Sequence, residues 1–404
     1  MSELVVNPYL QMEEMSDDSE LVVLKAPNPG RGLSIWNISR DEQPRLFELL
    51  SEIGPENVRL LDVENDLNDD DRETLRSHGV LVEADRQPSL PLFSCELSDI
   101  EPRSFDGELR VNHTFRFEPF DLTRFSESIN KRHISPFKAS VWIAYPTSGV
   151  EIGYWLEPKD AEVVSKFEPS NHASIDDAEL RGRLYAAGIL VDSSSTDEET
   201  ICEASASFAE KKYAVVERLL PPEQMAAMRR YYRDYVSNGF MHFGDTQVGG
   251  RYREQNEPIA VMLHHQLTNV VSRVSGREVK PSYVYAASYV GGADLAPHVD
   301  RLQCEYSISL QIDYEPEPEG HVSPWALSLE QLDKSLAPEP MGLYLGWEYL
   351  SDSRPSVHLN LASGDGLLYM GREMVHYRTA LPAGHSSTSL FLHYVDADFD
   401  GSLE

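Results

Sequence analysis

Residues 288–300 read SYVGGADLAPHVD, a strand-like segment and a glycine turn that end on His298 and Asp300. Side chains two positions apart on an extended segment point to the same face, so His298 and Asp300 can bind one ligand together. A second histidine, His376, follows in the later segment GDGLLYMGREMVHYRTALPAG at 364–384. Two imidazoles and one carboxylate on one face of a metal ion leave other coordination positions open. The sequence therefore predicts a metal site with His298, Asp300 and His376 as ligands.

Residues 201–404 are rich in short segments of strand-like composition, separated by turn-forming residues. These segments are PSYVYAASYV, YSISLQIDY, MGLYLGWEYL, SVHLNL, GLLYMG and TSLFLHYV. Regularly spaced short strands with turn signals between them are typical of a barrel or a sandwich. Ahead of them, the stretch at 208–236 predicts a short strand and then an amphipathic helix that Pro221 and Pro222 introduce.

The order of these signals is strand, turn, His-x-Asp, Gly-Asp, strand, His, turn and strand. This order resembles the Fe(II)/2-oxoglutarate-dependent dioxygenases, in particular their prolyl-4-hydroxylase-like branch, over about residues 206–396. The resemblance implies a double-stranded β-helix, a jelly-roll or cupin-like fold, in which His298, Asp300 and His376 hold Fe(II). It also implies 2-oxoglutarate as cosubstrate, O2 as oxidant and hydroxylation of an unactivated C–H bond.

The same resemblance implies residues that bind the cosubstrate. Tyr289 lies nine residues before His298, near a position where the family often has a tyrosine that hydrogen-bonds 2-oxoglutarate. The family's Arg or Lys for the distal carboxylate corresponds here to His385, which with Ser387 would bind a carboxylate more weakly and with pH dependence. Arg378, two residues after His376 and therefore on the same face of a strand, is the alternative that we favour, because its charge is permanent.

The N-terminal half predicts two small α+β modules, at 1–100 and 101–200, ahead of the oxygenase-like domain at 201–404. In each, two strands around a turn precede helices, and the module ends in a helix, a glycine and an apolar strand. These endings are LRSHGVLVEAD at 75–85 and LYAAGILVDSS at 184–194. The first module begins with an acidic tail that we expect to be unstructured, and DSSSTDEET near the end of the second predicts a linker. The fold class is therefore α+β.

Both modules resemble the winged-helix modules that bind leader peptides in pathways that modify ribosomally made peptides. The resemblance covers roughly 21–85 and 138–193. In such modules the peptide adds as a strand to an exposed sheet edge. Two winged-helix-like modules that only pack against the catalytic domain are the alternative.

Composition limits the partners of the chain. Its 404 residues carry 35 Lys and Arg against 67 Asp and Glu, a net charge of −32, which disfavours nucleic acid and anionic membranes as partners. Three widely spaced cysteines form neither a disulfide framework nor a zinc cluster. The N-terminus lacks the pattern of a signal peptide, and no apolar run reaches the roughly 18 residues of a membrane span. The sequence predicts a cytoplasmic protein and leaves its oligomeric state open.

Two classes of function follow. The first is an oxygenase that acts on a peptide or protein side chain recognised by residues 1–200, or, as a variant, on a free small-molecule or amino-acid substrate. The second is a metal-bearing binding protein without turnover, which the replacement of the family's Arg or Lys by His385 keeps open.

Overall fold

The computed structural model describes residues 3–14, 21–55, 57–63, 65–118, 138–145, 148–192, 199–350 and 355–403. These residues belong to two compact units, 1–91 with 232–245 and 92–231 with 246–404. Most of the predicted linker at 192–200 lies outside the described residues. The division into three domains at 1–100, 101–200 and 201–404 remains a prediction.

The smaller unit is an α+β module. Its strands are β1 (Leu4–Val6), β2 (Gln11–Glu14), β3 (Leu21–Asn28), β4 (Gly32–Ser39), β5 (Leu81–Glu83) and β13 (His242–Phe243). Its helices are α1 (Pro44–Ile53), the short 3-10 helix η1 (Val58–Leu60) and α2 (Asp69–Ser77). β2, β3 and β4 form one antiparallel sheet, and β1 pairs with β5. The predicted order of strands and helices over 21–85 is confirmed, whereas the winged-helix character stays a prediction.

The N-terminal tail contains two strands, so the expectation that it is unstructured was wrong for its described part. β1 pairs with β5 along three residues, and β2 pairs with β3 along four. Leu10 and Met12 are buried in the core of the smaller unit, together with Leu24 and Ile38. The apolar side chains of this segment therefore outweigh its acidic composition.

The larger unit begins with a second α+β module. Its strands are β6 (Cys95–Glu96), β7 (Leu109–Val111), β8 (Arg116–Phe117), β9 (Val141–Ala144), β10 (Glu151–Trp155) and β11 (Leu190–Asp192). Its helices are η2 (Leu97–Asp99), α3 (Pro158–Val164) and α4 (Ala178–Ala186). One sheet has the order β6-β10-β9-β8, and β11 pairs with β7.

Three longer helices follow, α5 (Glu199–Lys211), α6 (Pro222–Ser237) and α7 (Pro258–Ser275). The carboxylate of Glu257 caps α7 by accepting hydrogen bonds from the backbone N–H groups of Ile259 and Ala260. The second α+β module contacts two of these helices. Glu151 N–H donates to Gln266 Oε1 of α7 at 2.8 Å, and Arg230 of α6 forms an ion pair with Asp99 at 3.1 Å. None of the described helices is both long and apolar enough to cross a membrane.

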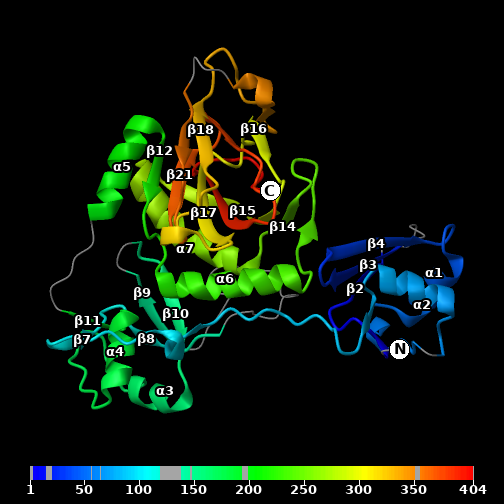
Figure 1. Ribbon diagram of the computed structural model, residues 1–404, viewed down its shortest axis with the longest axis horizontal. Helices are drawn as coiled ribbons and strands as arrows, with labels where there is room; N and C mark the ends of the chain where they lie inside the picture. The colour runs from blue at the N-terminus through cyan, green and yellow to red at the C-terminus, as the bar shows by residue number, and fades with distance from the viewer. Residues whose placement is uncertain are drawn as a thin grey trace. The chain divides into compact units, whose positions relative to one another are not determined.

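The C-terminal part is a jelly roll of two sheets, drawn from green at β12 to red at β23 in Figure 1. The larger sheet contains β12 (Tyr213–Val216), β21 (Gly366–Met370), β17 (Tyr306–Glu315), β23 (Ser386–Asp396), β15 (Val279–Val290) and β14 (Arg251–Gln255), in this order. The smaller sheet contains β19 (Leu343–Tyr344), β16 (Leu295–Val299), β22 (Met374–Arg378), β18 (Leu327–Gln331) and β20 (Val357–Leu359). Short 3-10 helices η4 (Glu319–His321) and η5 (Trp347–Tyr349) lie in its loops.

Strand order identifies the fold of this part. The chain passes from β15 to β16, to β17 and to β18, and then from β20 to β21, to β22 and to β23, changing sheet at each of these steps. This alternation is the arrangement of a double-stranded β-helix. The predicted jelly roll is therefore confirmed, and β16 and β22, which carry His298 and His376, are neighbours in the smaller sheet.

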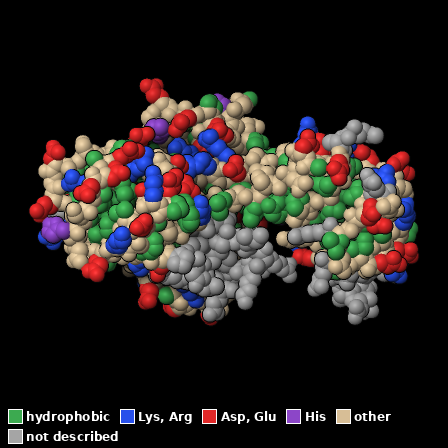
Figure 2. Space-filling view, turned by 90° about the horizontal axis from the view of Figure 1, so that it is seen from below, with side chains coloured by type: hydrophobic (Ala, Val, Ile, Leu, Met, Phe, Trp, Pro, Cys, Tyr) green, Lys and Arg blue, Asp and Glu red, His purple; other side chains and the backbone are tan. Residues whose placement is uncertain are grey.

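The exposed surface agrees with the acidic composition. On the face shown in Figure 2, acidic side chains are distributed among apolar and basic ones.

Candidate active site

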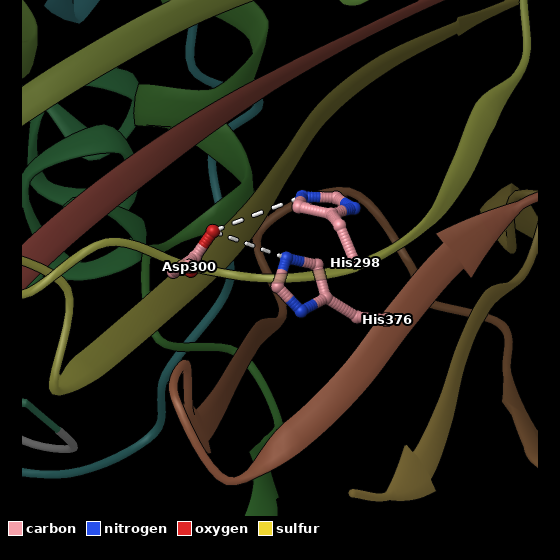
Figure 3. Close-up of side chains that lie close together, drawn as sticks. All are labelled: His298, Asp300 and His376. Carbon is pink, nitrogen blue, oxygen red and sulfur yellow. Dashed lines mark ion pairs between the residues drawn. The ribbon is translucent and has the colours of Figure 1, made fainter. Parts of the chain in front are cut away.

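The structure brings the three predicted metal ligands together. His298 on β16 lies directly opposite His376 on β22, and Asp300 follows β16. Asp300 Oδ1 lies 3.8 Å from His298 Nε2 and 3.3 Å from His376 Nε2 (Figure 3). The candidate ligand atoms of the three residues all lie within 4.8 Å of one another. Pairing of β16 with β22 thus brings together His298 and His376, which are 78 positions apart in the sequence. Because side chains alternate between the two faces of a strand, these opposed residues point to the same face.

The backbone orients both imidazoles. His298 Nδ1 lies 2.8 Å from the carbonyl oxygen of Ala296, and His376 Nδ1 lies 3.1 Å from that of Met374. A neutral imidazole that donates from Nδ1 has a free lone pair on Nε2. The two Nε2 atoms point toward Asp300, so each ring presents the atom that a metal ion would bind.

The carboxylate of Asp300 is held by neighbours. Ser307 Oγ donates to Asp300 Oδ2 at 3.2 Å, and Asp300 N–H donates to the carbonyl oxygen of Gly371 at 2.9 Å. A Cβ atom on Gly371 would overlap the carbonyl oxygen of Cys304 and lie 2.7 Å from Asp300 Oδ2. Only glycine fits there without a shift of the carboxylate.

The electrostatics of the cluster favour a bound cation. Burial, and then the nearby charge of His376, lower the pKa of His298 to about 3. Burial alone would lower the pKa of His376, but the Asp300 carboxylate raises it. Burial would raise the pKa of Asp300, but the imidazole of His376, and then those of His393 and His298, hold it well below its usual range. A buried carboxylate needs a positive partner, and a divalent metal ion on two nitrogens and one oxygen provides one.

Arg378 is a buried cation beside this cluster. It follows His376 by two residues on β22, so both side chains point into the jelly roll. Its side chain is 1% exposed, and its Nη1 donates to the carbonyl oxygen of Trp325 at 2.6 Å. Its Nε and Nη2 atoms have no hydrogen-bond partner among the described residues. Burial lowers the pKa of Arg378 to about 10, which leaves the guanidinium charged at neutral pH.

An unpaired buried guanidinium fits a carboxylate ligand. Its two unpartnered N–H groups match the two oxygens of a carboxylate, the geometry in which arginine binds most strongly. Trp325, which sequence reasoning did not single out, lies against this group, with its ring centroid 4.6 Å from the Arg378 guanidinium. Burial in such surroundings without an anion is costly, so the site is matched to an anionic group.

The other predicted cosubstrate residues occupy different positions. Tyr289 lies beside Trp325, with ring centroids 5.0 Å apart, and its hydroxyl accepts a hydrogen bond from Arg251 Nη1 at 3.0 Å. Ser387 lies opposite Tyr289 on the neighbouring strand β23. His385 Nδ1 shares a hydrogen bond of 2.8 Å with the hydroxyl of Tyr314. Tyr289 is thus part of the wall around Arg378, whereas the imidazole of His385 already has a partner.

Sequence reasoning missed the polar interior of the larger sheet. Ser307, Ser309 and Gln311 alternate with apolar residues on β17, and β23 places His393 opposite Ser307 and Ser389 opposite Gln311. Directly opposed residues share a face, and Ser307 contacts the triad, so this face lines the interior. The hydroxyls of Ser309 and Ser389 are buried without a partner among the described residues. The alternation in YSISLQI was the available signal.

The sequence matches no protein-family model and no curated protein. Solved structures are similar to about half of the chain. The epimerase SnoN from nogalamycin biosynthesis, in complex with Fe3+, α-ketoglutarate and nogalamycin RO, is 14% identical with a TM-score of 0.40 and covers 50% of this chain and 85% of its own. A prolyl-4-hydroxylase from Pseudomonas putida is 16% identical with a TM-score of 0.36 and covers 48% of this chain and 98% of its own.

A prolyl hydroxylase from Trichoplax adhaerens, in complex with a peptide of hypoxia inducible factor, is 11% identical with a TM-score of 0.38. It covers 48% of this chain and 89% of its own. These proteins differ among themselves in the reaction that they catalyse. Similarity at this level does not identify the reaction of this chain, so its function is inferred from its own residues.

Proposed function

We propose that this chain is an Fe(II)- and 2-oxoglutarate-dependent oxygenase. The observation that carries the proposal is that the buried triad and the buried guanidinium of Arg378 lie side by side within one jelly roll. A metal ion matches the triad, and a carboxylate matches the guanidinium. 2-Oxoglutarate has a metal-chelating keto acid at one end and a free carboxylate at the other, so it matches both.

When bound together, Fe(II), 2-oxoglutarate and O2 supply an oxidant that removes hydrogen from an unactivated C–H bond. The residues of the chain hold and orient these groups. In this proposal Nε2 of His298, Nε2 of His376 and the Asp300 carboxylate are the metal ligands. Three ligands on one face leave the opposite positions free for a chelating cosubstrate and O2. The hydrogen bonds from each Nδ1 keep the rings in the binding orientation.

Arg378 would set the direction of the cosubstrate. Two strand residues span about 7 Å, a distance that a five-carbon diacid and an arginine side chain bridge together. Ser387 lies six residues from His393, which is hydrogen-bonded to Ser307 beside Asp300, and six strand residues span about 20 Å. His385 precedes Ser387 by two residues and is therefore still further from His393. These distances support Arg378 rather than His385 as the residue that binds the distal carboxylate of 2-oxoglutarate. Tyr289 and Trp325 would line this part of the pocket and exclude water from it.

The substrate in this proposal is a peptide or protein side chain, which becomes hydroxylated in the cytoplasm. Residues 1–200 contribute a three-stranded and a four-stranded sheet of their own, in addition to the jelly roll. Extended peptides bind by adding to the edges of such sheets. A free small molecule or amino acid is the alternative substrate, and a binding protein without turnover is the alternative function.

The test of the metal and cosubstrate site is an anaerobic titration of the Fe(II)-loaded protein with 2-oxoglutarate. We expect a keto acid chelated to Fe(II) at this site to give a weak visible charge-transfer band. We expect the band to disappear in His376→Ala and to need far more 2-oxoglutarate in Arg378→Ala. Arg372→Ala is the matched control, because Arg372 donates to the carbonyl oxygen of Pro338 and precedes β22. Bound iron without a band would contradict the 2-oxoglutarate mechanism.

Deletion of residues 1–91 cannot serve as a clean test of peptide binding, because the smaller unit also includes 232–245. Crosslinking of the full-length protein to candidate peptides that carry a photoreactive group avoids this problem. Attachment within residues 1–200 supports a peptide substrate. Succinate release that depends only on a free amino acid or small molecule, with no attachment, favours the alternative substrate.

A further inference from the structure

A thiol and a phenol that the proposed mechanism does not use lie next to the triad. Cys304 Sγ and the hydroxyl of Tyr283 share a hydrogen bond of 3.1 Å. Cys304 is 1% exposed and Tyr283 is 8% exposed. Cys304 follows Asp300 by four residues, in a loop where its N–H donates to the carbonyl oxygen of Arg301 at 3.0 Å. The two side chains join the loop after Asp300 to strand β15.

The pair lies within reach of a metal ion bound to Asp300. Ligand-type atoms of Asp300, Cys304 and His393 all lie within 4.8 Å of one another. The ring of His393 also lies against the ring of Tyr283, with centroids 4.7 Å apart. The sulfur of Cys304 is therefore separated from the metal position by little more than the carboxylate of Asp300.

Arg301 restricts what this pair can do. Its Nε donates to the Tyr283 hydroxyl at 3.1 Å, and its guanidinium lies 4.3 Å from the centre of the Tyr283 ring. A positive charge in this position disfavours a second metal ion on Cys304 and His393. It also holds the ring, whose hydroxyl is hydrogen-bonded to the sulfur. Oxidation by a nearby metal centre is the chemistry that remains open to a buried, immobilised thiol and phenol.

We propose that Cys304 and Tyr283 become joined by a thioether between Sγ and the ring carbon next to the hydroxyl carbon. The S–H bond and one ring C–H bond break, and one S–C bond forms. The two protons and two electrons that leave pass to O2, which is reduced to hydrogen peroxide. The inference rests on the proposed function, because iron held by Asp300 activates the O2.

The geometry needs little change for this bond. The ring carbon that reacts is bonded to the carbon that carries the hydroxyl, and the sulfur already lies at hydrogen-bond distance from that hydroxyl. The sulfur needs to move only from the hydroxyl to this adjacent ring carbon. The product would tie the loop that carries Asp300 to β15, and so would hold the carboxylate in place during turnover.

Mass spectrometry of the full-length protein tests the thioether. Trypsin cleaves after Arg301 and so separates the Tyr283 peptide, 278–301, from the Cys304 peptide, 302–334. After exposure of the Fe(II)- and 2-oxoglutarate-loaded protein to air, we expect these two peptides to appear as one linked species that has lost two hydrogen atoms. Protein kept metal-free under air should give the two separate peptides.

Variants and an independent readout make the result decisive. Cys304→Ser and Tyr283→Phe should both abolish the linked species, whereas Cys202→Ser, at an exposed cysteine, should retain it. The charge-transfer band reports separately on the iron site. A normal band with unlinked peptides, or with oxygen added to Cys304 instead, overturns the thioether and leaves the proposed function intact. No band and no bound iron overturns both.

Discussion

Replacing Arg378 with methionine should weaken cosubstrate binding without weakening the fold. Methionine has a similar length and retains contact with the Trp325 ring, but it has no charge and no N–H group. The variant therefore removes the interaction with a carboxylate and also removes a buried cation whose Nε and Nη2 lack partners among the described residues. The substitution should lower the affinity for the cosubstrate but should not lower the free energy of unfolding. A purely structural role of Arg378 would instead lower the free energy of unfolding.

The size of each effect follows from the contacts. A hydrogen bond between charged groups contributes about 1.5–3 kcal/mol, so two bonds to a carboxylate contribute roughly 3–6 kcal/mol, or a factor of about 10²–10⁴ in Kd. In the cosubstrate-free protein, the variant loses the hydrogen bond from the guanidinium to the Trp325 carbonyl, about 1.5–3 kcal/mol. It also loses the penalty of an unpaired buried charge, and replacing buried ions with apolar residues is often neutral or stabilising by about 1–4 kcal/mol.

Two measurements check this prediction. Calorimetric titration of the Fe(II)-loaded, anaerobic protein with 2-oxoglutarate gives the Kd, and urea unfolding of the cosubstrate-free protein gives the free energy of unfolding. We expect a Kd that rises about 100-fold or more and a free energy of unfolding that does not fall. His385→Ala is the control and should change the Kd by less than about 3-fold, because its imidazole is bonded to Tyr314. A Kd that stays within 3-fold in Arg378→Met but rises strongly in His385→Ala would refute the assignment.

Three further outcomes are expected. Gly371→Ala should lower Fe(II) affinity about 10- to 100-fold in a metal titration, because its methyl group would displace the Asp300 carboxylate. Ser307→Ala should lower the same affinity about 10-fold, since one hydrogen bond to Asp300 is lost. Burial, and then the charge of Glu257, raise the pKa of Glu254 from 4.5 to about 8, so the folded protein keeps a proton that the unfolded chain releases. Stability should therefore fall as pH rises from about 4.5 to 8, and Glu254→Gln should be more stable at pH 8 by about 4 kcal/mol in urea unfolding, with little gain at pH 4.5.

The metal ligands could be predicted from the sequence because the spacing of residues along one strand decides which side chains share a face. His298 and Asp300 share a face at a spacing of two, and the same spacing relates His376 to Arg378. What the sequence did not contain was the pairing of β16 with β22, which opposes His298 and His376 directly. That register depends on the whole jelly roll, which the order of short strands and turns indicated but could not align residue by residue.

Two other features depended on tertiary burial. Helix α5 was missed, because the acidic and serine-rich residues ahead of it read as a linker, although Ile201, Ala204 and Phe208 are buried on one helical face. Trp325 was missed because nothing in its local sequence relates it to Arg378, 53 residues away. Its role follows only from the pairing of β18 with β22, which starts three residues after it.

The polar interior of the jelly roll is better explained by a ligand than by stability. Ser309 and Ser389 each bury a hydroxyl, and Arg378 buries two N–H groups, without partners among the described residues. Each such group costs about 1–3 kcal/mol, a large sum for a domain with a typical stability of about 5–15 kcal/mol. Helix α7, buried along most of its length and packed against β15 and β23, supplies compensating apolar contact. A cosubstrate that occupies the interior at about 100 times its Kd would add about 2.7 kcal/mol, so binding and folding should be coupled in this protein.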